Sequence, residues 1–322
     1  MSTLIIDRKN AVLAYREGAV ELRAADTAPR RIPLRGIERL ILRGAATVSS
    51  GLLAQCWERQ ISVLLLSGRR SAPTARFYGK SHNDAGLRVA QVLACTDRAL
   101  SLRLAAAVIG AKLRRQQHLL SRLAASRPDG RRRARSGLTA LAKARHRLRH
   151  APPAALDSLR GTEGAAAAGY FRSFSAFFAP ALGFDGRRRR PPPDPVNAVL
   201  SLGYTIAAFE AARCAAIAGL DPAIGALHGL AHGRNALGLD LVEPLRPLVD
   251  RLAYDLFHSR TLVDRHFARQ PDGGMLLGKA GRRHFYGAWE ERAGTLRRLA
   301  MAEARMAVRW LRQQPQLWPG QR

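Results

Sequence analysis

The first eighty residues alternate between short apolar runs and turn residues, a pattern that predicts β-strands. Strands are expected at residues 3–7, 11–18, 19–25, 31–35, 39–44, 61–67 and 75–80. Glu17 and Gly18 predict a hairpin turn, and residues 49–60 predict one helix with a serine at its N-cap. The pattern therefore predicts a β-rich domain over 1–80, followed by a polar linker, "SHNDAG", at 81–86.

From residue 87 onward apolar residues recur at steps of three and four, which predicts helices. Helices are expected within 87–125, 156–180, 196–219 and 292–314, with basic loops at 127–137 and 186–195. Asp194 and Pro195 are expected as cap and first residue of the nearly all-apolar helix, which Gly219 ends. Asp221 and Pro222 are expected to start the next helix. The fold class is therefore α+β, with a larger all-α domain over 87–322.

The chain is strongly basic, with 53 Lys and Arg against 24 Asp and Glu and a formal net charge of +29. Only five of the basic residues are lysine. The planar guanidinium of arginine binds phosphate oxygens in pairs, and an excess charge of this size favours a polyanionic partner. The composition favours nucleic acid over a membrane surface. The alternative is a basic proteome in which arginine stands in for lysine.

The composition also restricts the cellular setting. No transmembrane helix is expected, because Glu210 and Arg213 interrupt the most apolar segment, Val196–Ile217. The N-terminus, "MSTLIIDRKN", lacks the features of a signal peptide. The three cysteines are scattered and odd in number, which favours a reducing cytoplasm and argues against a cysteine metal site.

Four residues suited to metal binding or acid–base chemistry stand out in the helical part. Glu163 lies in "RGTEGAAAAGYF", His228 in "DPAIGALHG", and Asp240 and Glu243 in "LDLVEPLRP". A spacing of three places the last two on one face of a helix, unless Pro244 delays the helix start to Glu243. Carboxylates with one imidazole suit Mg²⁺ or Mn²⁺, either of which would polarise a phosphoryl oxygen and align an attacking hydroxyl.

Each of these residues also has a purely structural explanation. A glutamate near a helix N-terminus compensates the helix dipole, and a single histidine is more often a hydrogen-bonded core or surface residue. Asp240 and Glu243 are most simply partners of neighbouring arginines. Alone, the residues indicate a metal-assisted nucleic-acid enzyme and leave these alternatives open.

Several other motifs have two readings. The arginines in and near the candidate site are suited to phosphate contacts: Arg187, Arg188, Arg189, Arg190, Arg234 and Arg246. The first four, beside "PPPDP", form either a solvated loop or a rigid phosphate contact. His228 and His232 resemble half of a zinc pair, but no glutamate of a protease motif accompanies them. The aromatic residues between Tyr170 and Phe178 are expected in the core rather than as a base-stacking platform.

Three blocks carry a family resemblance: "LRGTEGAAAAGYF", "RRRRPPPDPVNAVLSLGYT" and "GLDPAIGALHGLAHGRNALGLDLVEPLRPLVD". In this order and spacing they resemble the CRISPR-associated spacer-acquisition integrase family, the first protein of the Cas series. The resemblance covers residues 155–320 strongly and the N-terminal third in pattern only. His232 and Asn235 stand where the family usually has other residues, which leaves the fine DNA contacts open.

The resemblance implies a small β-sandwich-like dimerisation domain followed by an all-α catalytic domain. It implies Mg²⁺ or Mn²⁺ bound through Glu163, His228 and Glu243, with Asp240 as a supporting catalytic carboxylate. It also implies a homodimer, two of which flank a dimer of a small companion protein, the second of the Cas series, to form a heterohexamer without a membrane partner.

The implied reaction is spacer integration. A 3′-hydroxyl of a short double-stranded DNA fragment attacks a phosphodiester at the boundary of the CRISPR repeat DNA, and with water the same site would be an endonuclease. Two alternatives compete with it: a non-catalytic basic nucleic-acid-binding scaffold, and an unrelated metal-dependent repair or RNA nuclease.

Overall fold

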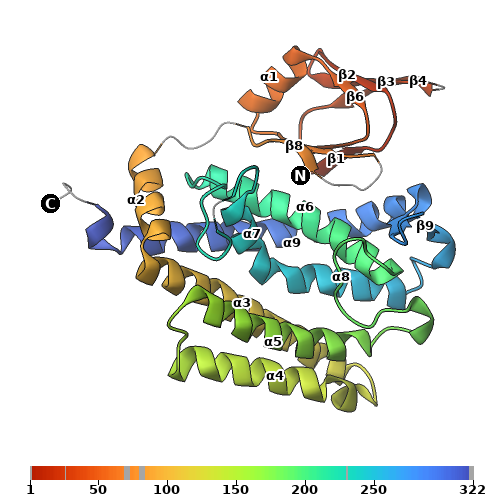
Figure 1. Cartoon of the computed structure of the whole chain (residues 1–322). Helices are drawn as coiled ribbons and strands as arrows, with labels where there is room; N and C mark the ends of the chain where they lie inside the picture. The colour runs from red at the N-terminus through yellow and green to blue at the C-terminus, as the bar shows by residue number, and fades with distance from the viewer. Residues whose placement is uncertain (1, 26, 69–72, 80–83, 230, 319–322) are drawn as a thin grey trace. The chain divides into compact units, whose positions relative to one another are not determined.

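The computed structural model describes residues 2–25, 27–68, 73–79, 84–229 and 231–318 (Figure 1). They form two compact units, one comprising residues 1–83 with 216–219 and the other residues 84–215 with 220–322. The expected linker, 81–86, lies partly outside the described residues, and helix α2 (Ala85–Thr96) begins within it. The sequence-based fold class, a small strand-rich region followed by a mostly helical part, is confirmed.

The described residues of the first unit form two four-stranded sheets and one helix. Its elements are β1 (Ser2–Ile6), β2 (Ala11–Arg16), β3 (Ala19–Ala24), β4 (Thr27–Pro33), β5 (Ile37–Arg43), β6 (Ala46–Val48), α1 (Ser50–Glu58), β7 (Ser62–Leu66) and β8 (Pro73–Phe77). One sheet has the order β1-β5-β7-β8, parallel except for β8, and the other has the order β4-β3-β2-β6. Strands far apart in sequence therefore pair in both sheets.

The two sheets and α1 share one apolar core. Leu13 and Val20 from one sheet, Leu40 and Val63 from the other, and Leu52 from α1 are all almost completely buried in the same cluster. Every second residue of a strand points to the same face, so each sheet contributes one apolar face to this core. The unit is thus a two-layered β structure closed by a helix.

The hairpin predicted at Glu17 and Gly18 is present. Val20 pairs with Tyr15 across the antiparallel ladder of β2 and β3. Both turn residues have positive φ angles, 48° and 80°, as a two-residue turn matching the strand twist requires. Ser49 caps α1 by accepting a hydrogen bond from the backbone of Leu52. Local sequence rules therefore account for these two features.

The second unit is built mainly from helices. They are α2, α3 (Arg98–Ala125), α4 (Gly130–His150), α5 (Leu156–Ser175), α6 (Pro195–Ile217), α7 (Ala236–Val242), α8 (Arg246–His258) and α9 (Lys279–Arg312). Short 3₁₀ turns lie at η1 (Pro180–Leu182), η2 (Glu243–Leu245), η3 (Asp264–His266) and η4 (Pro315–Leu317). A small antiparallel hairpin, β9 (Phe267–Arg269) and β10 (Met275–Leu277), interrupts the helical order.

Helices α3, α4 and α5 pack against one another, α8 packs against α3, and α9 packs against α8 (Figure 1). Aspartates set several helix starts. Asp84 caps α2, Asp97 caps α3, and Asp194 caps α6, each accepting from the backbone N–H three residues further on. The expected role of Asp194 is therefore confirmed. No helix in the described part of the chain is long and apolar enough to span a membrane.

The prediction of a loop at 127–137 is wrong, because helix α4 begins at Gly130. The glycines of this helix are needed for close packing. A Cβ at Gly137 would lie 2.7 Å from the Cβ of Ser173 on α5, so only glycine lets the two helices approach this closely. The N–H of Gly137 also donates to the hydroxyl of Ser173 at 2.8 Å. A residue type that usually breaks helices here serves helix–helix contact.

Two further boundaries differ from expectation. No helix starts at Asp221; residues 221–229 are irregular and the next helix, α7, begins at Ala236. The final helix, expected over 292–314, starts at Lys279. In the first case, contacts with other elements hold the irregular backbone, as described below.

Candidate functional site

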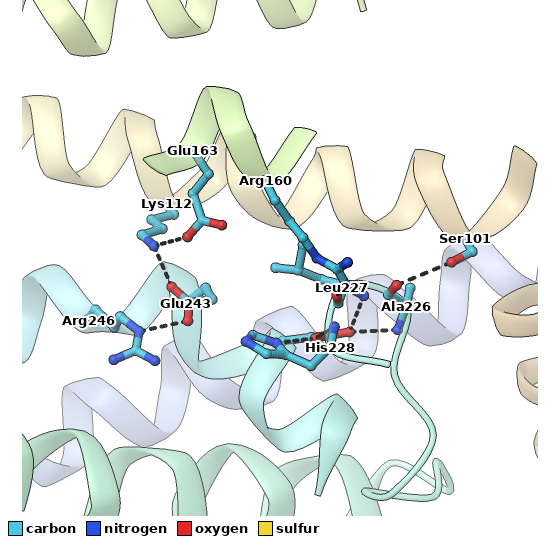
Figure 2. A network of polar contacts seen from close by, with 10 residues as sticks. Ser101, Lys112, Arg160, Glu163, Ala226, Leu227, His228, Glu243 and Arg246 are labelled. Atoms are coloured by element: carbon cyan, nitrogen blue, oxygen red, sulfur yellow. Dashed lines mark hydrogen bonds and ion pairs between the residues drawn. The ribbon is translucent and has the colours of Figure 1, made fainter. Parts of the chain in front are cut away.

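Glu163 lies in the middle of α5 rather than at its start. It is the eighth residue of a helix that begins at Leu156. The dipole of a helix acts on charges within its first turn, so dipole compensation does not explain this carboxylate. Its side chain is 21 % exposed and turns toward α3 and η2 (Figure 2).

The ammonium group of Lys112 on α3 joins two of the predicted site residues. Its Nζ contacts Oε1 of Glu163 and lies 2.6 Å from Oε2 of Glu243 in η2. Lys112 and Glu243 are almost completely buried. Two carboxylates that are 80 residues apart in sequence therefore meet at one cation (Figure 2).

A second cation fixes the other oxygen of Glu243. Nε of Arg246, one turn further on, donates to its Oε1 at 2.8 Å. Burial raises the pKa of a carboxyl group, but the charges of Arg246 and Lys112, with a smaller contribution from His228, lower the pKa of Glu243 to about 2. This carboxylate is therefore ionised at any physiological pH.

His228 is oriented by Asp240, the fourth predicted residue. Nδ1 of the imidazole lies 2.8 Å from Oδ1 of Asp240, and because an ionised carboxylate only accepts, the ring donates. The imidazole Nε2 is thereby left to face the space that Glu163 and Glu243 also face (Figure 2). Asp240 also accepts the backbone N–H groups of Ala226, Leu227 and His228 at 2.7–3.0 Å.

The irregular segment that carries His228 is held from several sides. Gln91 on α2 bonds the backbone of Asp221 and Ile224 through three hydrogen bonds of 2.7–2.9 Å. Ser101 on α3 donates to the carbonyl of Ala226, and Arg160 on α5 donates to that of Leu227. These contacts replace the hydrogen bonds that a regular element would supply.

Gly225 adds a steric requirement to this segment. A Cβ there would lie 2.8 Å from Oδ2 of Asp240 and 2.6 Å from the backbone carbon of Ala236. The carboxylate can thus reach three backbone N–H groups only because residue 225 has no side chain.

Behind Arg246 lies a buried group of tyrosines. Tyr170 donates to Oδ2 of Asp250 at 2.8 Å, and Tyr204 donates to Oδ1. The guanidinium of Arg246 lies 4.4 Å from the ring centre of Tyr204. Burial raises the pKa of Asp250 to about 6, although the tyrosine hydrogen bonds and nearby arginines oppose this. Arg246 therefore contacts this network through Tyr204 as well as pairing with Glu243.

Within the described residues, no three His, Cys, Asp or Glu side chains are arranged as a ready metal site. The donor types nevertheless suit a hard divalent cation: two carboxylates and an imidazole whose other nitrogen is fixed by a third carboxylate. The shared point between Glu163 and Glu243 already receives a positive charge, that of Lys112. The residues fit Mg²⁺ or Mn²⁺ chemically, and the position of Lys112 separates them from a complete site.

The six predicted phosphate-binding arginines fall into two groups. Arg187 is engaged by the protein, donating to Asn197 at 2.8 Å and to Ser201 at 3.0 Å, and Arg246 is paired with Glu243. The other four are exposed: Arg188, Arg189, Arg190 and Arg234. DNA contact by any of them stays a prediction, and the exposed group is better placed for it.

The aromatic residues and the second histidine singled out in the sequence lie outside the candidate site. Tyr170 and Phe174 of α5 and Phe177 and Phe178, which follow it, are buried, and Phe171 is partly buried, so these aromatic residues belong to the core, as expected. His232 is exposed and outside the site, and no zinc arrangement occurs among the described residues.

Sequence reasoning missed Lys112, Gln91 and Arg160. Each lies in an ordinary amphipathic helix, where nothing in the hydrophobic pattern distinguishes it from surface residues. One signal was available for Lys112: it is a lysine in a chain whose positive charge is almost entirely arginine.

Comparison with known proteins gives a consistent result. A family model described as "CRISPR associated protein Cas1" matches residues 4–291. A CRISPR-associated endonuclease Cas1 of Thermodesulfovibrio yellowstonii is 33 % identical over 322 residues, covering 100 % of this chain and 95 % of the relative. Another, of Rhodospirillum rubrum, is 37 % identical over 281 residues, covering 83 % and 79 %.

Solved structures share the fold at lower identity. A CAS1 protein from Thermotoga maritima superposes with a TM-score of 0.84 at 20 % identity, covering 97 % of both chains. A casposase bound to an integration product has a TM-score of 0.82 at 20 % identity, covering 97 % of this chain and 90 % of that one. A Cas6-RT-Cas1–Cas2 complex contains a chain with a TM-score of 0.80 at 22 % identity, covering 98 % and 36 %.

Proposed function

This chain belongs to the Cas1 family of CRISPR-associated proteins, and from that premise we propose that it is a divalent-metal-dependent DNA endonuclease and integrase. Its substrates are short double-stranded DNA fragments and CRISPR repeat DNA. A 3′-hydroxyl of the fragment attacks a phosphodiester of the repeat, so that one phosphodiester forms as another breaks. The relatives are named endonucleases, and the fold also serves a casposase whose structure contains an integration product.

One observation carries the proposal. Glu163 of α5 and Glu243 of η2 meet at a single cation, with the imidazole of His228 facing the same space (Figure 2). Ordinary surface ion pairs do not bury a carboxylate this deeply or gather two carboxylates at one point. Such a cluster is costly for stability alone, which favours a catalytic role.

Glu163, His228 and Glu243 would hold the Mg²⁺ or Mn²⁺, which when bound polarises the phosphoryl oxygen and lowers the cost of the negative charge that develops there. The protein residues prepare this arrangement. Asp240 fixes the imidazole by accepting from Nδ1, and Arg246 keeps Glu243 ionised. Exposed arginines, such as Arg188 and Arg234, would hold the flanking phosphates without reading bases.

The partners follow from the same premise. We propose a homodimer that assembles with a small Cas2 companion into a heterohexamer, because a chain of this fold occurs in a Cas6-RT-Cas1–Cas2 complex. The net charge of +29 is compatible with assembly on DNA.

The test is strand transfer of a labelled DNA fragment into repeat DNA with Mn²⁺ or Mg²⁺. Glu163→Ala, His228→Ala and Glu243→Ala should each abolish joining while binding DNA nearly as well as the wild type. Asp240→Asn should slow joining by about 10- to 100-fold, since it acts through His228. Glu291→Ala removes an exposed acid on α9 and should join normally.

The competing functions give different results. A non-catalytic scaffold would yield no product and no effect of a chelator, and a repair or RNA nuclease would cleave branched DNA or RNA in preference to joining fragments. Wild-type joining by all three alanine variants would refute the site assignment.

A further inference from the structure

Lys112 differs from the other described lysines of the chain. Lys9, Lys143 and Lys279 are exposed, whereas Lys112 is 5 % exposed and lies between two carboxylates. A chain with 53 Lys and Arg uses lysine at only five positions, and one of them is this buried one. A compact ammonium group can approach two carboxylate oxygens at once and is smaller than the planar fork of arginine.

The ammonium group makes the negative cluster possible. Without it, the buried Glu243 and the partly buried Glu163 would repel each other in surroundings of low polarity. Arg246 neutralises only Glu243, through its Oε1. Glu163 has no other ion pair among the described residues, so Lys112 is the charge that draws it toward Glu243.

A divalent ion would need the same oxygens. Magnesium and manganese bind carboxylate oxygens at short distance. Lys112 contacts one such oxygen of each residue, Oε1 of Glu163 and Oε2 of Glu243. An ammonium and a divalent ion cannot share this position, because they would repel each other at close range. The long, flexible stem of lysine allows the ammonium to move aside.

We propose that Lys112 is an internal counter-cation, which holds Glu163 and Glu243 together in the metal-free protein and must leave its position when a divalent ion binds. Lys112 thereby stabilises the metal-free fold and weakens metal affinity at the same time. This inference rests on the proposed function, because it takes Glu163 and Glu243 as metal ligands.

The experiment compares wild type with Lys112→Met, which keeps the length of the side chain and removes its charge. Without metal, Lys112→Met should melt at a lower temperature, because two carboxylates lose their shared cation. In isothermal titration with Mn²⁺ its dissociation constant should fall by about tenfold or more, since no cation has to be displaced. The rise in melting temperature on adding Mn²⁺ should be correspondingly larger.

Four further variants make the result decisive. Lys143→Met removes an exposed lysine from α4 and should change neither quantity. Glu243→Gln should weaken Mn²⁺ binding, which tests the metal site itself. If Lys112→Met does not fold, Lys112→Gln, which can still donate a hydrogen bond to a carboxylate, takes its place in the titration. In that case the double variant Lys112→Met/Glu243→Gln should fold, because it no longer carries the excess negative charge.

The outcomes separate the two proposals. Unchanged or weaker Mn²⁺ binding after loss of the Lys112 charge, together with weakened binding in Glu243→Gln, overturns the role of Lys112 and leaves the metal site standing. Unchanged Mn²⁺ binding in Glu243→Gln overturns the metal site, and the role of Lys112 with it. A double variant that fails to fold also overturns the counter-cation role.

Discussion

Glu243 shows how a single residue depends on its neighbours. Its carboxylate is buried, which opposes ionisation, yet Arg246 and Lys112 contact one oxygen each. The attraction of two cations outweighs the desolvation, so the charge is retained where metal binding would need it. The same attraction links the stability of the fold to pH.

Glu243→Gln should remove an acid-sensitive part of the stability. The folded pKa of about 2 lies below the usual 4.5, so the stabilisation is present above pH 4.5 and is lost as the pH falls toward 2. The pH-dependent part of the difference in unfolding free energy between wild type and variant should be about 3 kcal/mol. Denaturation by urea at pH values from 2 to 6 measures it.

The raised pKa of Asp250 acts in the opposite direction but is common to both proteins, so it cancels in this comparison. A difference that stays constant between pH 2 and pH 5 would show that Glu243 is not held ionised by its neighbours.

At the residue scale, the acidic residues and the histidine of the candidate site could be predicted from the sequence, but the lysine that pairs with the acids could not. Glu163, His228, Asp240 and Glu243 stood out because such residues are rare in an alanine- and arginine-rich chain. The structure brings them together, and metal binding itself stays a prediction. Lys112 could not be distinguished, because the role of a buried cation is defined by partners that are distant in sequence.

Among the elements, the irregular segment 221–229 is unusual, because it positions His228 without regular secondary structure. Its backbone is fixed by side chains of α2, α3, α5 and α7. Gln91 makes three of these hydrogen bonds and is itself buried. The order of the segment therefore depends on side chains from helices that precede it, such as Arg160 at a separation of 67 residues from Leu227, and from α7, which follows it.

Gln91→Leu should loosen this segment while leaving the helices intact. The loss leaves the N–H of Asp221 and the carbonyl of Ile224, both partly buried, without these partners, at a cost of up to about 1–3 kcal/mol each, so amide hydrogen exchange at residues 221–229 should speed up by about tenfold or more. Strand transfer should fall because His228 is less well placed. Thr96→Val, on the exposed face of the same helix, is the control, since Thr96 bonds only carbonyls of α2. Equal exchange in both variants would contradict the role of Gln91.

Elements were predicted well wherever a local rule decided them. The hairpin at Glu17 and the cap at Asp194 depend on a few adjacent residues, and both were found. Gly137 was misread as part of a loop, because its function is contact with Ser173 of another helix. The helix expected from Asp221 is absent for the same kind of reason, since Gln91 binds its backbone.

At the scale of the whole molecule, the arginines differ in how freely they can contact DNA. Arg187 and Arg246 are engaged by the protein, whereas Arg188, Arg189 and Arg190 are exposed on the loop before α6. Arg188 pairs only with an exposed aspartate, Asp185, and such pairs are weak in water. This loop can therefore exchange its present contacts for phosphates at little cost.

Replacing Arg188, Arg189 and Arg190 together by alanine should weaken DNA binding and lower its salt dependence. Each lost phosphate contact reduces the slope of the logarithm of the binding constant against the logarithm of salt concentration by about 0.9, so the slope should fall by up to about 3. The matched control replaces three exposed arginines of α4, Arg131, Arg132 and Arg135, which removes the same charge. If the loop contacts phosphates directly, its variant should lose more slope than the control, because long-range attraction alone depends on total charge and not on position. Fluorescence anisotropy between roughly 50 and 300 mM salt, the range in which counterion release dominates, measures the two slopes. Equal slopes for the two triple variants would show that the loop contributes only long-range attraction and no direct phosphate contacts.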